Sequence, residues 1–296
     1  MVWENCNVTL NSGEGGILYT GEIVTGSVII EFKKEQKIEY VEFKVIGITK
    51  ARWSRVMPTV PYLRIYSGKC KVLDTTVNIF SEINGKKIQP GMKNFQFHFN
   101  LPSDLPSTFK SSIAKVYYYI RIKCKGSFNR NKIKIVPFVV MSSVDLNHRD
   151  DIKVPMIFEM SKAFTSSGTF LMYFKTYRGF ASKQRLTFEI DILNEKKVKI
   201  SKIVVTLIQK LEYTVSTGYA NAEKKICKTE HNALWNNIKE SARIYMDVPQ
   251  TAPSSINVVN PMIDISYVLR VEVIFKFHFT LLKDIPVTIA TVPVLH

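Results

Sequence analysis

The chain has 296 residues, of which 46% are hydrophobic and 22% are charged, and Lys and Arg outnumber Asp and Glu by 41 to 25. A disordered or collagen-like chain is excluded, because apolar residues are plentiful while the 13 Gly and 12 Pro are few. At roughly 100–200 residues per domain the length predicts two domains. The net charge of +16 predicts an anionic partner: nucleic acid, an anionic membrane surface, or an acidic or phosphorylated peptide.

Alternating hydrophobic and polar residues predict β-strands along the first half of the chain. The predicted strands are residues 28–32, 41–48, 95–99, 116–123 and 134–140. Side chains two positions apart on a strand point to the same face. Phe95, Phe97 and Phe99 are therefore expected to share one face and fill a core.

The second half of the chain continues the same pattern, with one weak helical signal over residues 230–241. Its predicted strands are residues 186–193, 198–213, 242–248, 267–279 and 285–293. Many strands with almost no helix are typical of antiparallel sandwiches, each of which uses about 100–150 residues. The predicted fold class is therefore all-β, with two tandem, immunoglobulin-like antiparallel β-sandwiches.

A polar segment at residues 145–151 interrupts the strand pattern and predicts the joint between the domains. We place the N-terminal sandwich at residues 1–148 and the C-terminal sandwich at residues 149–296. Asp150 and Asp151 in this joint are adjacent, so their side chains diverge. They are interpreted as part of a solvated link and not as a catalytic carboxylate pair.

The ends and the cysteines predict a cytoplasmic protein. The N-terminus lacks the basic and apolar regions of a secretory signal, and no uncharged apolar run approaches the ~18–20 residues of a membrane span. The four cysteines, at positions 6, 70, 124 and 227, lie far apart and form no CxxC pair. In a chain of this length they are expected to be reduced, buried thiols.

Several ordered segments resemble the α-arrestins, also called arrestin domain-containing proteins. They are residues 19–28 (YTGEIVTGSV), 47–53 (GITKARW), 90–102 (PGMKNFQFHFNLP), 105–109 (LPSTF), 116–122 (VYYYIRI) and 286–294 (PVTIATVPV). Each motif alone is weak, but their order and spacing together are specific and cover nearly the whole chain. Residues 176–184 depart from the family, because they lack its Gly-Tyr-x-Pro-Gly-Glu turn. The chain thus looks like a divergent member.

The resemblance implies a cytosolic adaptor and no enzyme. Such an adaptor binds cytoplasmic parts of membrane proteins and influences their endocytosis, endosomal sorting and signalling, with a peripheral position at the plasma membrane or endosomes. None of the 12 prolines is adjacent to another, so the chain has no PPxY motif and the expected core lacks the tail that recruits WW-domain ubiquitin ligases. Two alternatives stay open: a retromer-type arrestin-fold sorting subunit, and a tail-less arrestin that competes with full-length relatives.

Basic clusters are the candidate binding sites. The first contains Arg121, Lys123, Lys125, Arg130, Lys132 and Lys134, which flank one predicted turn, and period 2 puts its first three members on one face. The second contains Lys196, Lys197, Lys199 and Lys202, and a third contains Lys224, Lys225 and Lys228. They are interpreted either as sites for acidic or phosphorylated tails and lipid head groups, or as solvated loops and edge-protecting lysines.

No catalytic, metal or cofactor site is predicted. The sequence has no phosphate-binding loop, HExxH, GxSxG or kinase signature, and its five histidines are isolated. Nucleic acid is disfavoured as a partner, because the aromatic residues lie in apolar runs and are not interleaved with basic residues on an exposed face.

Overall fold

The structure, a computed structural model, describes residues 3–11, 16–57, 62–126, 130–164, 168–233 and 237–295. Contacts within the chain divide it into two compact units. The first unit is Met1–Ser143, Tyr213–Tyr219 and Asn257–Met262, and the second is Val144–Glu212, Ala220–Ile256 and Ile263–His296. The predicted domain boundary at residues 148/149 stays a prediction.

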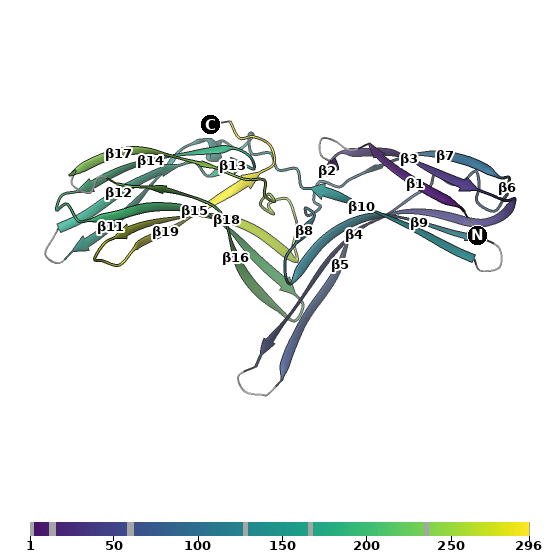
Figure 1. Ribbon diagram of the computed structural model, residues 1–296, viewed down its shortest axis with the longest axis horizontal. Helices are drawn as coiled ribbons and strands as arrows, with labels where there is room; N and C mark the ends of the chain where they lie inside the picture. The colour runs from purple at the N-terminus through teal and green to yellow at the C-terminus, as the bar shows by residue number, and fades with distance from the viewer. Residues whose placement is uncertain are drawn as a thin grey trace. The chain divides into compact units, whose positions relative to one another are not determined.

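Two sheets form the sandwich of the first unit (Figure 1). One has the order β1-β3-β7, with β1 at Asn5–Asn11, β3 at Ile23–Phe32 and β7 at Gly91–Asn100. The other has the order β2-β10-β9-β4-β5, with β2 at Ile17–Tyr19, β10 at Arg130–Met141, β9 at Ala114–Gly126, β4 at Gln36–Val56 and β5 at Leu63–Val77. Short strands β6 (Lys87–Ile88) and β8 (Phe109–Lys110) pair with β4 and β9.

The second unit repeats this plan. Its four-stranded sheet has the order β11-β12-β14-β17, with β11 at Met156–Phe164, β12 at Gly168–Thr176, β14 at Arg185–Asn194 and β17 at Lys239–Asp247. Its five-stranded sheet has the order β13-β19-β18-β15-β16, with β13 at Gly179–Ala181, β19 at Leu281–Ala290, β18 at Ile263–Phe275, β15 at Ile200–Val215 and β16 at Gly218–His231. The prediction of two tandem antiparallel β-sandwiches is confirmed.

Two element predictions need correction. The weak helix over residues 230–241 is wrong, because β16 ends at His231 and β17 begins at Lys239, with residues 234–236 outside the described part. The strand predicted for 267–279 ends at Phe275. A short helix, α1 (Asp150–Lys153), lies in the predicted joint. Among the described residues no helix is long and apolar enough to cross a membrane.

Aromatic side chains fill the core between the two sheets of each unit. In the first unit Phe95, Phe97 and Phe99 of β7 are all buried, as their alternation predicts. The ring of Phe97 lies 4.8 Å from that of Phe43 on β4, so the two sheets meet at this pair. In the second unit Phe275 of β18 packs edge-on against Phe170 of β12, with ring centroids 5.2 Å apart.

In each unit one buried tyrosine of the larger sheet holds a loop in place. The Tyr118 hydroxyl on β9 donates a hydrogen bond to the Pro106 backbone oxygen at 2.5 Å, and burial raises the pKa of Tyr118. The Tyr267 hydroxyl on β18 donates to the Ala252 oxygen and accepts from Gln209 Nε2 at 2.6 Å. Burial raises the pKa of Tyr267 to about 12. Both hydroxyls therefore stay protonated and able to donate at neutral pH.

A bulge interrupts the pairing of β4 with β5. The register shifts between Gly47 and Ile48, because Gly47 pairs with Leu73 but Ile48 pairs with Lys71. A Cβ on Gly47 would approach the Tyr118 ring to 2.5 Å, so only glycine fits beside the buried tyrosine. The β5 residues before the bulge present Lys69 and Lys71 on the outer face of the sheet.

Replacing Tyr118 by Phe tests the loop anchor. We expect Tyr118→Phe to lower the free energy of unfolding by about 1 kcal/mol, because the Pro106 oxygen loses its donor. Urea titration followed by circular dichroism measures the change. Tyr119→Phe, on the outer face of the same strand, is the matched control and should change stability by less than about 0.5 kcal/mol. Equal losses in the two variants would contradict a specific anchor.

Candidate functional site

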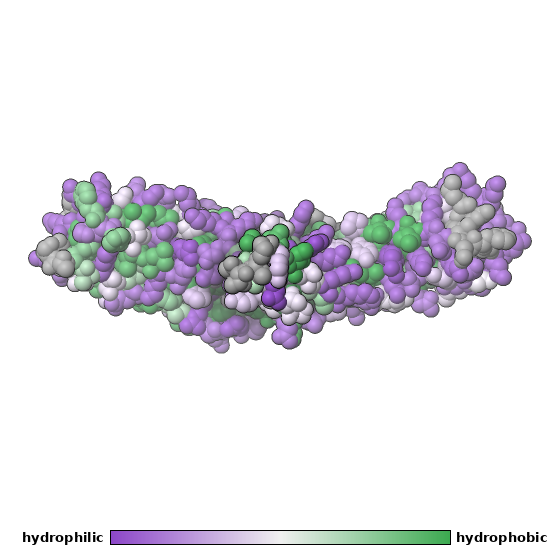
Figure 2. Space-filling view, turned by 90° about the horizontal axis from the view of Figure 1, so that it is seen from below, coloured by the Kyte–Doolittle hydropathy of each residue, from purple (hydrophilic) through white to green (hydrophobic). Residues whose placement is uncertain are grey.

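The first predicted basic cluster begins on the outer face of β9. Arg121, Lys123 and Lys125 alternate with buried Ile122 and Cys124, so the three cationic side chains share that face. Figure 2 shows hydrophilic residues over much of one face of the molecule, with hydrophobic patches between them. A charged outer face is consistent with the sequence pattern of this strand.

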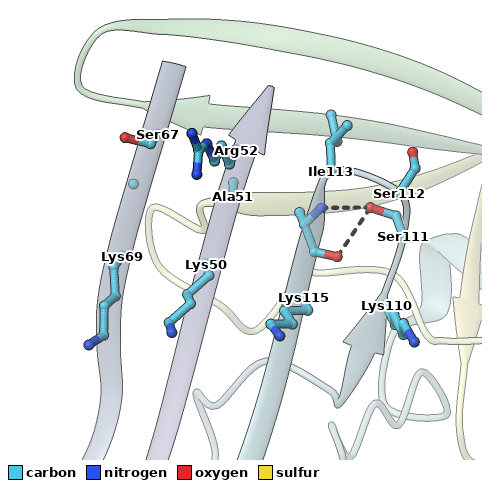
Figure 3. Close-up of a pocket in the computed structure, with 12 residues that line it drawn as sticks. Lys50, Ala51, Arg52, Ser67, Lys69, Lys110, Ser111, Ser112, Ile113 and Lys115 are labelled. Carbon is cyan, nitrogen blue, oxygen red and sulfur yellow. Dashed lines mark hydrogen bonds between the residues drawn. The ribbon is translucent and has the colours of Figure 1, made fainter. Parts of the chain in front are cut away.

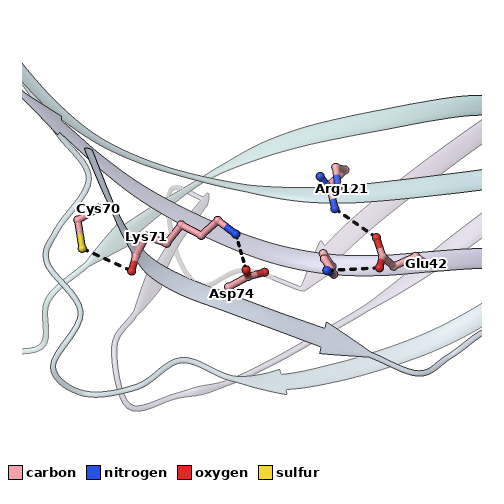
Figure 4. A network of polar contacts seen from close by, with 6 residues as sticks. Glu42, Cys70, Lys71, Asp74 and Arg121 are labelled. Carbon is pink, nitrogen blue, oxygen red and sulfur yellow. Dashed lines mark hydrogen bonds and ion pairs between the residues drawn. The ribbon is translucent and has the colours of Figure 1, made fainter. Parts of the chain in front are cut away.

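Partners on β4 neutralise much of this charge. Arg121 forms an ion pair with Glu42 that is drawn in Figure 4, with Nη2 3.2 Å from Oε2, and Lys125 Nζ lies 2.7 Å from Glu39 Oε2. The Lys123 ammonium lies 5.8 Å from the ring centroid of Tyr40. Ion pairs of this kind compete with any anionic ligand, so this part of the first cluster is a weak candidate site.

The remaining members of the first cluster do not join this face. Lys132 is opposite Cys124 and Lys134 is opposite Ile122, so both point to the inner side of β10. Lys132 Nζ donates to the Trp3 backbone oxygen at 2.8 Å. The side chain of Arg130 lies outside the described residues. The structure thus divides the first cluster between two faces.

The second and third clusters lie on strands and connections of the second unit. Lys196, Lys197 and Lys199 are exposed between β14 and β15. Lys202 of β15 and Lys228 of β16 both bind the carboxylate of Glu230, each at 2.9 Å. Their hydrogen bonds lower the pKa of Glu230 to about 2. The other third-cluster residues, Lys224 and Lys225, are exposed on β16. The turn at residues 196–199 and the pair at residues 224–225 are therefore the exposed parts of these two clusters.

The sequence analysis missed a row of four lysines that stand in register across neighbouring strands. Lys110 of β8 is opposite Lys115 of β9, Lys115 is opposite Lys50 of β4, and Lys50 is opposite Lys69 of β5. Figure 3 shows the four side chains side by side. Directly opposite residues share a face, and like charges in that position destabilise a sheet. We call these four residues the lysine row.

The lysine row borders an open pocket of about 560 Å³ that Arg52 also lines. None of these five cations forms an ion pair with a carboxylate of the described residues, and the acids of this sheet pair elsewhere: Glu42 with Lys44 and Arg121, Asp74 with Lys71 (Figure 4). The ammonium groups of Lys50 and Lys115 lie 5.7 and 5.3 Å from the ring centroid of Tyr117. The pocket therefore concentrates uncompensated positive charge.

Hydrogen bonds fix the rim of this pocket where β9 begins. Ala114 N donates to Ser111 Oγ at 3.0 Å, and Ser111 Oγ donates to the Ala114 oxygen at 3.2 Å (Figure 3). Arg52 N donates to the Ile113 oxygen at 2.7 Å. The turn that carries Lys110 and Lys115 is thus held against β4 before any ligand arrives.

A second pocket, in the second unit, has mixed charge. Its volume is about 720 Å³, and it is lined by Arg149, Asp151, Arg178 and Asp264 among others. Arg149 Nη2 pairs with Asp151 Oδ2 at 2.9 Å, so its charges largely compensate one another. Across the ranges that the structure describes, no group of three His, Cys, Asp or Glu side chains could hold a metal ion.

Comparisons with known proteins point to one family for both units. The family model "Arrestin (or S-antigen), N-terminal domain" matches residues 6–147, and "Arrestin (or S-antigen), C-terminal domain" matches residues 176–294. Arrestin domain-containing protein 5 of Homo sapiens is 24% identical over 73% of this chain and 65% of its own length. Arrestin domain-containing protein 5 of Bos taurus is 23% identical over 72% of this chain and 67% of its own length. Arrestin domain-containing protein 1 of Rattus norvegicus is 28% identical over 43% of this chain and 30% of its own length.

Removing one charge from the lysine row tests whether the row is repulsive. We expect Lys69→Gln to raise the free energy of unfolding by about 0.2–1 kcal/mol at low ionic strength, because Lys50 loses a like charge directly opposite. The gain should shrink in 1 M salt, where the Debye length is about 3 Å. Thermal unfolding at both ionic strengths measures it, with Lys224→Gln as a control outside the row. A loss of stability at low salt would contradict the repulsion.

Proposed function

This chain belongs to the arrestin family, in the branch of the arrestin domain-containing proteins, and from that membership we propose that it is a non-enzymatic adaptor for membrane proteins. Its ligands would be cytoplasmic segments of membrane proteins, and its effect would be on their endocytosis, endosomal sorting and signalling. The observation that carries the proposal is the presence of both arrestin domains, in order, along the chain.

The charge of the chain supports acidic or phosphorylated segments as the ligands. The net charge is +16, and both the lysine row and the turn at residues 196–199 expose cations. Hydrogen bonds between a cation and a carboxylate or phosphate are about twice as strong as neutral ones. A segment bearing such groups would therefore bind with a strong dependence on ionic strength.

We place the protein in the cytoplasm, in peripheral contact with the plasma membrane or endosomes. An anionic membrane surface would add about 1 kcal/mol for each basic residue held near it. Because no two prolines are adjacent, the sequence contains no PPxY motif, and binding of a WW-domain ligase through that motif is not part of the proposal. The predicted division into domains 1–148 and 149–296 is retained as a proposal.

Proximity labelling of the full chain in cells tests the adaptor function. We expect membrane and endosomal proteins to be enriched over an unrelated basic β-protein, and their cytoplasmic segments to be retained in pulldown assays. Absence of such enrichment would reject the proposal. Stable co-purification with a large coat complex would instead indicate a retromer-type subunit.

Charge reversal at the exposed turn tests where those segments bind. Lys196→Glu/Lys199→Glu should weaken pulldown of acidic or phosphorylated segments several-fold, because each reversal turns an attraction into a repulsion. Lys196→Gln/Lys199→Gln is the matched control, which removes charge without reversing it and should have a smaller effect. Identical binding by all three proteins would exclude the turn as the contact.

A further inference from the structure

We propose that two copies of this chain pair along the free edge of β7 and so form a two-fold symmetric dimer. The three-stranded sheets of the two copies would join into one six-stranded sheet, with β7 of each copy antiparallel to β7 of the other. The inference goes beyond the adaptor function, because it concerns a second copy of the chain and a strand outside the basic clusters.

β7 has one neighbour in its sheet. It is an outer strand of the order β1-β3-β7 and pairs with β3 along residues 91–100 (Figure 1). Among the described residues, no further backbone hydrogen bond reaches its other side. The strand contains no proline, so each of its residues has an N–H to donate. A free strand edge of this length is a template for pairing with another strand.

The hydrogen bonds directly after β7 show which of its backbone groups face the free edge. Leu101 N donates to the Glu22 oxygen at 3.0 Å, and the Leu101 oxygen accepts from Gly21 N at 2.7 Å, so both groups point toward the segment that leads into β3. Backbone groups alternate in direction along an antiparallel strand. The even-numbered residues of β7 therefore direct their N–H and C=O groups to the free edge. They are Met92, Asn94, Gln96, His98 and Asn100.

These five residues define the register of the dimer. When Gln96 lies opposite Gln96 of the second copy, Asn94 lies opposite His98 and Met92 lies opposite Asn100. Each of the five then exchanges hydrogen bonds with its opposite residue in both directions. Five donors from each copy give about ten hydrogen bonds between the two chains.

The registers on either side of this one use the edge less completely. A two-fold axis displaced by one residue from Gln96 would place Pro90 opposite Asn100 in one direction, and Pro102 opposite Met92 in the other. Proline has no N–H to donate. The register centred on Gln96 is therefore the one in which all five outward-facing residues are paired.

The side chains of this edge allow two copies to approach each other. From Asn94 to Asn100 the strand has no charged residue, and Lys93 would lie opposite Phe99 and not opposite a second Lys93. Like charges that are directly opposite destabilise a sheet. In a chain with a net charge of +16, an uncharged edge is where a second copy meets the least repulsion.

The other edge strands longer than three residues are less suited to a second copy. Lysines or arginines lie on β5, β11, β16 and β17, and charged edge residues are a common protection against association. β1, the other edge of the same sheet, is uncharged, but Lys132 lies beside its start and donates to the Trp3 oxygen at 2.8 Å. Two copies joined there would bring these lysines together.

β7 is held in its paired, extended form before a second copy binds. Its three phenylalanines are at most 7% exposed, and the ring of Phe97 lies 4.8 Å from that of Phe43 on the opposite sheet. The side chains that alternate with them, from Asn94 to Asn100, are exposed. Because the strand needs little further ordering, most of the hydrogen-bond energy is available for association.

Sedimentation equilibrium of the full chain tests for the dimer. We expect the apparent mass to rise reversibly from that of a monomer toward that of a dimer as concentration increases, because an interface of two strand edges is small. Association should strengthen with ionic strength, since salt screens the repulsion between two cationic chains. A monomer at every concentration and ionic strength would overturn the proposal.

Adding a charge at the two-fold axis tests the edge. Gln96→Lys should weaken dimerisation several-fold, because it places two like charges directly opposite each other. Thr9→Lys is the matched control: Thr9 is opposite Ser27, and Ser27 is opposite Gln96, so the same charge enters the same row two strands away from the edge. This control should dimerise nearly as the unchanged chain does. Equal weakening in both variants would overturn the proposal, because net charge alone would explain it.

Mixing two variants tests the register. Gln96→Lys and Gln96→Glu each place like charges at the axis, whereas a mixed dimer places opposite charges there. We expect an equimolar mixture, with one variant fluorescently labelled, to dimerise more strongly than either variant alone. Mixed dimers also show that both variants are folded, and circular dichroism of each confirms it. Mixed association no stronger than that of the separate variants would contradict the register centred on Gln96.

Discussion

The pairing of β4 with β9 on one side and β5 on the other determines what the outer face of the first unit presents. Phe43, Ile120 and Ile122 on the inner face are completely buried, so a slip of one residue would expose them and bury the charged side chains. Burial of each such side chain stabilises by about 1.5–3 kcal/mol, whereas an opposed pair of like charges costs about 0.2–1 kcal/mol. The hydrophobic core therefore holds the lysine row in register against its own repulsion.

The larger sheets of the two units share two structural features. A short parallel strand pairs with the last long strand of each larger sheet: β2 with β10 in the first unit and β13 with β19 in the second. The third strand of that order, β9 or β18, carries the buried tyrosine that holds a loop. The differences between the units lie in what the outer faces carry. Acids pair with cations in both units, at Glu39 and Glu42 in the first and at Glu230 in the second, whereas the pocket bordered by the lysine row belongs to the first.

Local alternation was sufficient to predict the sandwiches but not the pocket. The phenylalanines of β7 and the alternation of β9 reveal their buried faces directly, because period 2 is a local property of the sequence. The helix predicted near residue 230 failed, since polar residues there are on an exposed edge strand and its connection and not on a helix face. The lysine row depends on which residues of distant strands are opposite each other. Lys50-x-Arg52 and Lys69-x-Lys71 were the local signals, but β5 alternates too weakly to be predicted as a strand.

The bulge in β5 has a consequence for how this edge strand is encoded. Val72 has no partner on β4, and everything before it on β5 is displaced by one position relative to an unbroken ladder. In an unbroken ladder Cys70 would be opposite Lys50, and Lys69 and Lys71 would lie on the inner side of the sheet. The inserted Val72 therefore determines which side chains of β5 lie on the outer face of the sheet. Whether these lysines lie on the outer or the inner side of the sheet depends on one inserted position, not on the composition of the strand.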